Sequence, residues 1–169
     1  MTAQVEVRVE PVETPLPAVE YRWDADTDIL AATLPAVAAG EGMSGSVEME
    51  GQDGSWLIFD VHGGRISGVQ VAVWPPVRQV TGLAPPADAP PGRVTIPARR
   101  SQPGIAAVEV DTRLIADADR SERTFHFRFG AGRAASAVRL AQDLVLDLDD
   151  RGRIAGVWLL NVPPFPTDQ

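Results

Sequence analysis

The carboxylates at the ends of expected strands are the side chains most able to do chemistry. Asp24, Asp26 and Asp28 alternate along the chain, a spacing that can direct several oxygen ligands at one cation. A calcium loop of the EF-hand type also needs glycine at its sixth position and glutamate at its twelfth, where Ile29 and Pro35 stand instead. The triplet therefore predicts a solvated turn before a strand, with weak cation binding as the alternative.

Asp60 and Asp147 occupy the same place in two similar stretches, each at the end of an apolar strand. If a twofold axis related these strands, the two carboxylates could approach each other and share a proton, as carboxylate dyads do. No catalytic loop signature accompanies them. His62 lies in a glycine-rich turn and His126 on the polar face of an expected strand, and neither is next to a nucleophile. We therefore assign no catalytic residues and expect a protein that is not an enzyme.

The segment Gly40–Gly45 has the spacing of a dinucleotide-binding loop, and Ser44 and Ser46 lie within or beside it. A dinucleotide loop requires a following helix, whereas residues 46–50 resemble a strand. A serine nucleophile requires a sharp strand-to-helix turn, which this segment does not predict. The chain contains no cysteine and no lysine, which excludes thiolate metal sites, cysteine nucleophiles and Schiff-base lysines. We predict no cofactor and no metal.

The charge of the chain is unevenly distributed. The net charge is −8, and residues 1–84 hold 4 arginines and 12 acids whereas residues 85–169 hold 11 of each. An acidic first part favours pairing with the second part and disfavours nucleic-acid binding. The alternative is a solvated surface on which charges have drifted. An arginine-rich face of the second part could also hold an acidic partner; it comprises Arg93, Arg99, Arg100, Arg113, Arg120, Arg123, Arg128, Arg133 and Arg139.

The length and composition are those of an ordinary globular chain. The 169 residues are 44% hydrophobic and contain no apolar stretch long enough to cross a membrane. The N-terminus shows no basic segment followed by an apolar one, so no signal peptide is expected. We therefore expect a soluble, cytoplasmic protein with no membrane partner.

An internal repeat organises the chain. Gly64–Val69 (GRISGV) returns as Gly152–Val157 (GRIAGV), and a Pro-Pro pair follows each copy. Such a repeat predicts a duplicated unit. We assign residues 1–76 and 93–169 to two β repeats that share one core, because each is near the lower size limit for a stable core. Residues 77–92 between them are rich in proline and predict a stiff, extended linker.

The expected elements of each repeat are strands. Phe125–Phe129 alternates aromatic and polar residues, which is typical of a half-buried strand, and Trp56–Phe59 and Leu144–Leu146 are continuous apolar runs, typical of strands covered on both faces. Gly68 and Gly156 in the return strands indicate a bulge or a close approach of backbone. We expect a mainly β fold, a sandwich or closed barrel with pseudo-twofold symmetry and about four strands per repeat. Little helix is expected.

Smaller expectations concern single groups. Leu34–Ala39 could form one or two helical turns, and Ala134–Leu140 is ambiguous between helix and strand. Arg65 and Arg153 are expected to pair with Asp60 and Asp147 across their turns. The tryptophans Trp56, Trp74 and Trp158 are expected to fill the core or the contact between the repeats, and an exposed one would mark a protein-contact site.

Two segments of the chain have patterns of a known kind, Tyr21–Leu30 (YRWDADTDIL) and Asp147–Leu160 (DLDDRGRIAGVWLL). They are similar to the opening strand and to the closing hairpin, of the type DxDxDGxIxGIEIL, of a family of small prokaryotic domains of unknown function. The chain departs from the pattern at Gln70 and Trp158, where the family usually has glutamate, and at Leu114–Ala116. The resemblance implies a small β-rich unit and brings no activity or catalytic residues.

These observations favour a protein that works without catalysis. We expect a structural or protein-interaction module, either a monomer whose repeats form an intramolecular pseudo-dimer or a homodimer. The alternative is a β barrel that binds a small ligand or an ion, favoured by the acidic triplet and by the β-rich repeats.

Overall fold

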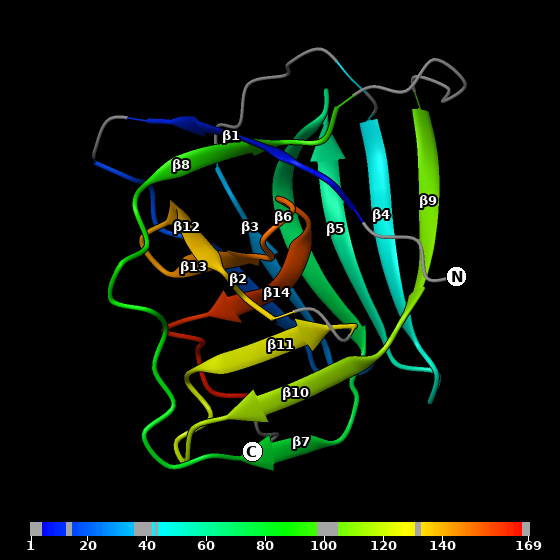
Figure 1. The fold of residues 1–169 in the computed structure, drawn as a ribbon. Coiled ribbons are helices and arrows are strands. Elements are labelled where there is room, and N and C mark those ends of the chain that lie inside the picture. The colour runs from blue at the N-terminus through cyan, green and yellow to red at the C-terminus, as the bar shows by residue number, and fades with distance from the viewer. Residues whose placement is uncertain are drawn as a thin grey trace.

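The protein folds into two β sheets, seen in a computed structural model (Figure 1). The structure describes residues 5–12, 15–35, 42, 44–97, 105–130 and 133–166, and only the backbone of residues 105–108. This part of the chain contains fourteen strands and no helix. The predicted mainly β fold is therefore confirmed.

The larger sheet curls so that it partly surrounds the core (Figure 1). Its strand order is β1-β8-β6-β5-β4-β9. In addition, β3 pairs with another part of β6, and β2 pairs with β3. Its strands are β1 (Arg8–Pro11), β2 (Glu20–Asp24), β3 (Ile29–Thr33), β4 (Ser44–Gly51), β5 (Trp56–His62), β6 (Arg65–Val73), β8 (Gly92–Thr95) and β9 (Ile105–Thr112). Its pairs are antiparallel except for the parallel pair of β4 and β9.

The smaller sheet has the order β12-β13-β14-β11-β10-β7. Its strands are β7 (Val77–Gln79), β10 (Leu114–Ala118), β11 (Phe125–Phe129), β12 (Ser136–Ala141), β13 (Leu144–Leu148) and β14 (Ile154–Leu159). All its pairs are antiparallel except for the parallel pair of β7 and β10. The ambiguous segment 134–140 therefore contains a strand, and Leu34 is not helical, while residues 36–39 lie outside the described part.

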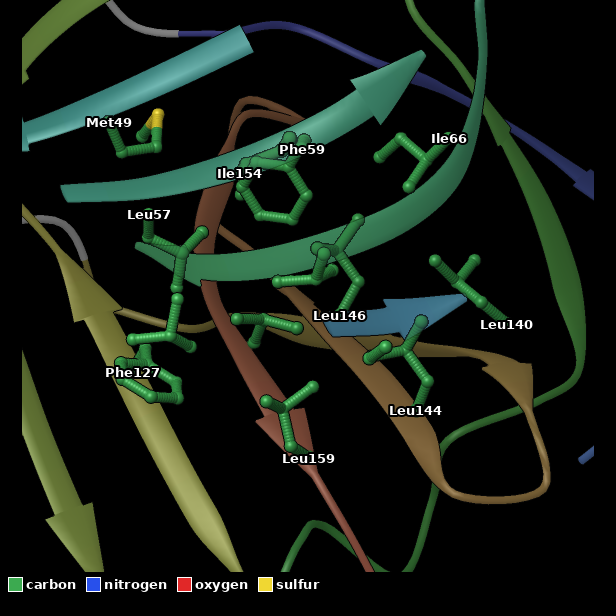
Figure 2. Close-up of a cluster of buried hydrophobic side chains, with 14 of the residues drawn as sticks. Met49, Leu57, Phe59, Ile66, Phe127, Leu140, Leu144, Leu146, Ile154 and Leu159 are labelled. Atoms are coloured by element: carbon green, nitrogen blue, oxygen red, sulfur yellow. The ribbon is translucent and has the colours of Figure 1, made fainter. Parts of the chain in front are cut away.

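One apolar core lies between the two sheets (Figure 2). Phe125, Phe127 and Phe129 are buried on one face of β11, as their alternation predicts. Figure 2 shows Phe127, Leu146 and Leu159 of the smaller sheet in one cluster with Leu57 and Phe59 of the larger one. The same cluster takes residues from both expected repeats, so that the two halves of the chain bury their apolar faces against each other.

The two continuous apolar runs behave differently. Every residue of β13 is buried, whereas β5 buries alternate residues. The reason is the proline-rich segment 77–92, which does not extend freely. Its strand β7 pairs with β10, and its Leu83 and Ala89 pack with Val145 and Trp158 on the outer face of the smaller sheet. This segment covers the second face of β13, whereas the outward-facing residues of β5 from Trp56 to Asp60 are only half-buried.

The two halves have the same strand connections. The order β2-β3-β6-β5-β4 in the first half matches β10-β11-β14-β13-β12 in the second. The leading segments cross over: the N–H of Val7 donates to the carbonyl of Gly152, and that of Ile96 donates to the carbonyl of Gly64. The correspondence supports the duplication, which we keep as a hypothesis. The described part of residues 1–76 contains six strands, more than the four expected.

Candidate functional site

Four aromatic side chains from distant parts of the chain gather where the two halves meet. Trp23 is on β2, Trp74 follows β6, Phe125 begins β11, and Phe165 lies in the segment after β14. On β2, exposed and half-buried residues alternate, so Trp23 turns its ring inward together with Tyr21. Pro75 and Pro76 follow Trp74 at once and cannot continue the ladder as donors, which ends β6 at this point.

The rings contact one another in favourable geometries. Trp23 stacks on Trp74 with ring centroids 5.7 Å apart and an interplanar angle of 17°. Phe165 meets Trp23 edge-on at 5.1 Å, and Trp74 lies 5.2 Å from Phe125. Offset-stacked and edge-on pairs are the arrangements that the ring quadrupoles prefer. The cluster joins β2 and β6 of the larger sheet to β11 of the smaller one.

The indole groups of this cluster, and the phenol of Tyr21 on the same strand as Trp23, have internal hydrogen-bond partners. Nε1 of Trp23 donates to the carbonyl of Pro163 over 2.8 Å, and Nε1 of Trp74 donates to the carbonyl of Asp28 over 2.8 Å. The hydroxyl of Tyr21 donates to the carbonyl of Leu160 over 2.7 Å. Burial, with the negative charge of Asp143, raises the pKa of Tyr21 above its ordinary value, so this donor stays protonated. The segment after β14 is thus tied to β2.

The aromatic cluster leaves a pocket open to solvent, which we call the aromatic pocket. Its volume is about 280 Å³, and it is lined by Trp23, Asp28, Trp74, Val77, Glu122, Phe125 and Phe165. Asp28 ends the turn between β2 and β3, and Glu122 lies in the corresponding turn between β10 and β11. Both have a positive φ, 62° for Asp28 and 55° for Glu122. Two equivalent turns therefore each contribute one acidic residue to the lining of the same pocket.

The acidic triplet forms the turn that the sequence predicts. Oδ1 of Asp24 accepts the N–H of Asp26, and the carbonyl of Asp24 accepts the N–H of Asp28. The three residues are exposed. Among the described residues no group of three or more histidine, aspartate or glutamate side chains is arranged to hold a metal ion. Only Asp28 of the triplet reaches the aromatic pocket.

A second polar cluster lies on the outer face of the smaller sheet. Nε2 of His126 is 2.7 Å from Oδ2 of Asp147, and Nε1 of Trp158 donates to Oδ1 of the same carboxylate over 3.2 Å. The ring of His126 stacks on Trp158 at 3.8 Å. Side-chain exposure is 13% for His126 and 3% for Asp147, because residues 77–92 cover this face. Neither the aromatic pocket nor the pocket lined by Pro86 and Ser136 includes this pair.

The two repeated aspartates do not meet, contrary to the dyad considered from the sequence. Both point away from the core between the sheets, Asp60 from β5 and Asp147 from β13. Asp60 accepts from Nε2 of Gln70 instead, over 3.1 and 3.0 Å. The expected pairing of Arg153 with Asp147 is also wrong, because Nε of Arg153 donates to Asp149 over 2.9 Å.

The repeated glycines make room for these aspartates. A Cβ atom on Gly156 would lie 2.6 Å from the carbonyl oxygen of Phe127 and 2.8 Å from Oδ2 of Asp147. A Cβ on Gly68 would lie 2.9 Å from the carbonyl oxygen of Ala32 and 3.1 Å from Oδ2 of Asp60. The close approach of backbone expected at Gly68 and Gly156 is present, and it explains why the motif retains glycine in both places.

The remaining sequence candidates have structural roles. Ser44 and Gly45 belong to strand β4, so no helix follows the glycine-rich segment, of which residues 40, 41 and 43 lie outside the described part. The hydroxyl of Ser44 accepts the N–H of Gly63, and Ser46 contacts Glu48. His62 is exposed at the end of β5.

The arginine-rich region does not neutralise the acidic first half. Arg128 and Arg78 both bind Asp117, each over 3.1 Å, and Arg153 binds Asp149. Within the described ranges, no arginine after residue 84 forms an ion pair with an acid before it. The described residues therefore show no ion pair in the predicted direction, although Arg78 of the first part does bind Asp117 of the second.

Sequence reasoning missed the aromatic pocket, although it placed Trp74 at the contact between the repeats. A usable signal was the pair of similar endings, Trp74-Pro75-Pro76 and Pro163-Pro164-Phe165, which each put an aromatic beside two prolines. No described helix is long and apolar enough to cross a membrane. Comparison with models of known protein families and with curated proteins found no match for this chain, so the resemblance to the small prokaryotic domain stays a prediction.

Proposed function

We propose that this protein is a non-enzymatic binding module that contacts a protein partner through the surface around the aromatic pocket. The observation that carries the proposal is the position of its exposed apolar residues. Val77 and Phe165 line the pocket with 38% and 41% of their surface exposed, and Val73, next to Trp74, is 46% exposed. Of the large apolar residues that are exposed in the described part, only Val9 lies elsewhere.

Such a patch has the composition of a protein-binding surface. Tryptophan and phenylalanine supply a large contact area with few rotatable bonds, which is why aromatic residues dominate the binding energy of interfaces. The indole rings are held in place by their hydrogen bonds to Asp28 and Pro163. A partner would therefore meet a surface that is ordered before binding, which reduces the entropic cost of association.

A small ligand is the second candidate. The pocket, at about 280 Å³, is close to the lower end of the range of roughly 300 to 1,000 Å³ in which small-molecule sites fall. Its aromatic walls favour this reading. The exposed valines around it favour the larger partner, because they extend the apolar surface beyond what a small molecule covers.

Other features support a role without catalysis in a soluble protein. The His126–Asp147 pair is packed against Trp158 beneath residues 77–92, away from the aromatic pocket. A cytoplasmic location and the lack of nucleic-acid partners remain expectations from the sequence, and the net charge of −8 supports the second. We also infer that the matching strand orders arose by duplication.

Site-specific photocrosslinking in the cells that make the protein tests this function. A photoreactive phenylalanine analogue at Phe165 is expected to give a discrete crosslinked protein. The matched control carries the analogue at Val9, which is equally exposed on β1 but outside the pocket lining, and is expected to give none. If Phe165 gives no crosslink, or both positions give the same product, the proposed surface is wrong.

A further inference from the structure

We propose that the group received by the aromatic pocket is a cationic side chain, an alkylammonium or guanidinium carried by a segment of the protein partner. This inference rests on the proposed function and adds the chemical class of the contact. It follows from which polar groups of the pocket are already bonded and which are not.

The pocket has no free side-chain donor. The lining residues include two donors, Nε1 of Trp23 and Nε1 of Trp74, and both donate to backbone carbonyls of the protein itself. The side chains of Val77, Phe125 and Phe165 have no donor. An anion or a carbonyl group would therefore find no side chain in the lining to bind it. The pocket offers aromatic rings and carboxylates instead.

The two carboxylates are without partners. Within the described residues, the side chains of Asp28 and Glu122 form no hydrogen bond or ion pair. Both are exposed and lie in turns with positive φ, a conformation that is uncommon for residues other than glycine and especially for glutamate. Strained positions of this kind cluster at functional sites. Two acidic residues in the lining of one pocket complement a cation.

The aromatic walls complement the same ligand. A cation over the face of tryptophan is attracted by the ring quadrupole, and cages of aromatic residues with acidic neighbours recognise ammonium groups in this way. Trp23 and Trp74 are half-buried, so their rings are partly accessible from the pocket. The exposed Val73 and Val77 beside them favour a cation carried by a polypeptide over a free one, because they can contact its neighbouring residues.

Two probes of the same shape, one cationic and one neutral, test the preference for a cation on the intact protein. Choline is titrated against its neutral isostere, in which a tert-butyl group replaces trimethylammonium, and the indole N–H signals of Trp23 and Trp74 are followed by NMR. We expect choline to bind about tenfold more tightly than the isostere, with an affinity that falls as salt is added. Equal affinities, or shifts confined to Trp56 and Trp158, would overturn the proposal.

Variants assign the effect to the two carboxylates. Glu122→Gln and Asp28→Asn are each expected to weaken choline binding about threefold to tenfold, because they remove charge and keep shape. Asp88→Asn, at an exposed acid that lines the pocket beside Pro86 and Ser136, is the matched control and is expected to change nothing. An unchanged affinity in both pocket variants would also contradict the proposal.

The source of the cation is decided by a second set of probes. Peptides with a central arginine or lysine are expected to bind more tightly than choline, and tighter binding of choline would overturn the assignment to a protein segment. The result is separable from the proposed function. If Phe165 crosslinks to a protein but choline and its isostere bind equally, the cationic ligand is wrong and the proposed protein-binding surface stands. If Phe165 gives no crosslink and the two probes bind equally, both proposals are wrong.

Discussion

Asp149 shows how a single carboxylate organises a hairpin. Its Oδ1 accepts the N–H groups of Arg151 and Arg153, each over 2.9 Å, and its Oδ2 accepts from Nε of Arg153. Burial opposes ionisation of Asp149, but these hydrogen bonds outweigh it and hold the pKa below the ordinary value. Asp119 and Asp53 accept backbone and hydroxyl donors in the same manner in their own turns. Asp149, Asp119 and Asp53 are therefore structural side chains of their turns.

Asp149→Asn is expected to lower the free energy of unfolding at pH 7 by about 1–2 kcal/mol, because hydrogen bonds to a charged acceptor are lost. A lowered pKa in the folded state stabilises the protein above the unfolded-state pKa and is lost as pH falls through the folded value. The difference from the original protein should therefore shrink below about pH 4.

Urea denaturation between pH 7 and pH 2 measures this. Asp150→Asn, at the exposed neighbouring position, is the control and should have little effect. A difference that stays constant over the whole pH range, or that is as large in the control, would contradict the assignment.

At the scale of elements, the repeated hairpin keeps its aspartate and glycine in both copies but differs in the partners of the aspartate. In β5–β6 the aspartate binds Gln70, and in β13–β14 it binds His126 and Trp158, while the glycine beneath it is unchanged. The difference follows the surroundings. The outer face of the first hairpin is half-buried. Residues 77–92 cover that of the second, so its polar groups are buried and must bond to one another.

Gly156→Ala is expected to destabilise the protein by about 1–3 kcal/mol, because the new methyl group would contact the Phe127 carbonyl and the buried Asp147. Gly68→Ala should cost less, since its nearest neighbours are farther away and the Asp60 side chain can move toward solvent. Thermal and urea unfolding of the two variants compare these costs directly. Equal stability of Gly156→Ala and the original protein would show that the contact does not constrain the strand.

At the scale of the molecule, the halves depend on each other. One core takes side chains from both, and the leading segment of each half bonds to the hairpin of the other, at Val7 with Gly152 and Ile96 with Gly64. The buried N–H of Val19 in the first half likewise donates to the carboxylate of Asp143 in the second half. The aromatic pocket exists only in this arrangement, because Asp28 comes from one half and Glu122 from the other.

We therefore expect fragments 1–91 and 92–169 to be unfolded as separate monomers, since each would expose the apolar face that the other covers. Mixing them should restore the NMR spectrum of the whole chain. A fragment that unfolds cooperatively as a monomer, shown by analytical ultracentrifugation and circular dichroism, would contradict this dependence. A fragment that folds only as a homodimer would support the duplication.

Local pattern was sufficient for several strands and turns of this protein. The alternation of Phe125–Phe129, the turn at Asp24–Asp28 and the close approach at Gly156 all depend on neighbouring residues or on one adjacent strand, so the sequence predicts them. The continuous apolar run of Leu144–Leu146 predicts burial on both faces, and every residue of β13 is buried, but the same prediction is wrong for Trp56–Phe59. The difference results from residues 77–92 packing over β13 and not over β5, a contact between distant segments that local pattern does not record.

The candidate site, like the covering of β13, depends on contacts between distant segments of the chain. Trp23, Trp74, Glu122 and Phe165 are up to 142 positions apart in the sequence, and no spacing among them resembles a motif. They meet because two halves with the same strand order pack around one core and bring equivalent turns to the same place. Sequence determines which residues can form strands and turns, whereas only the packing of the halves decides which side chains share a pocket.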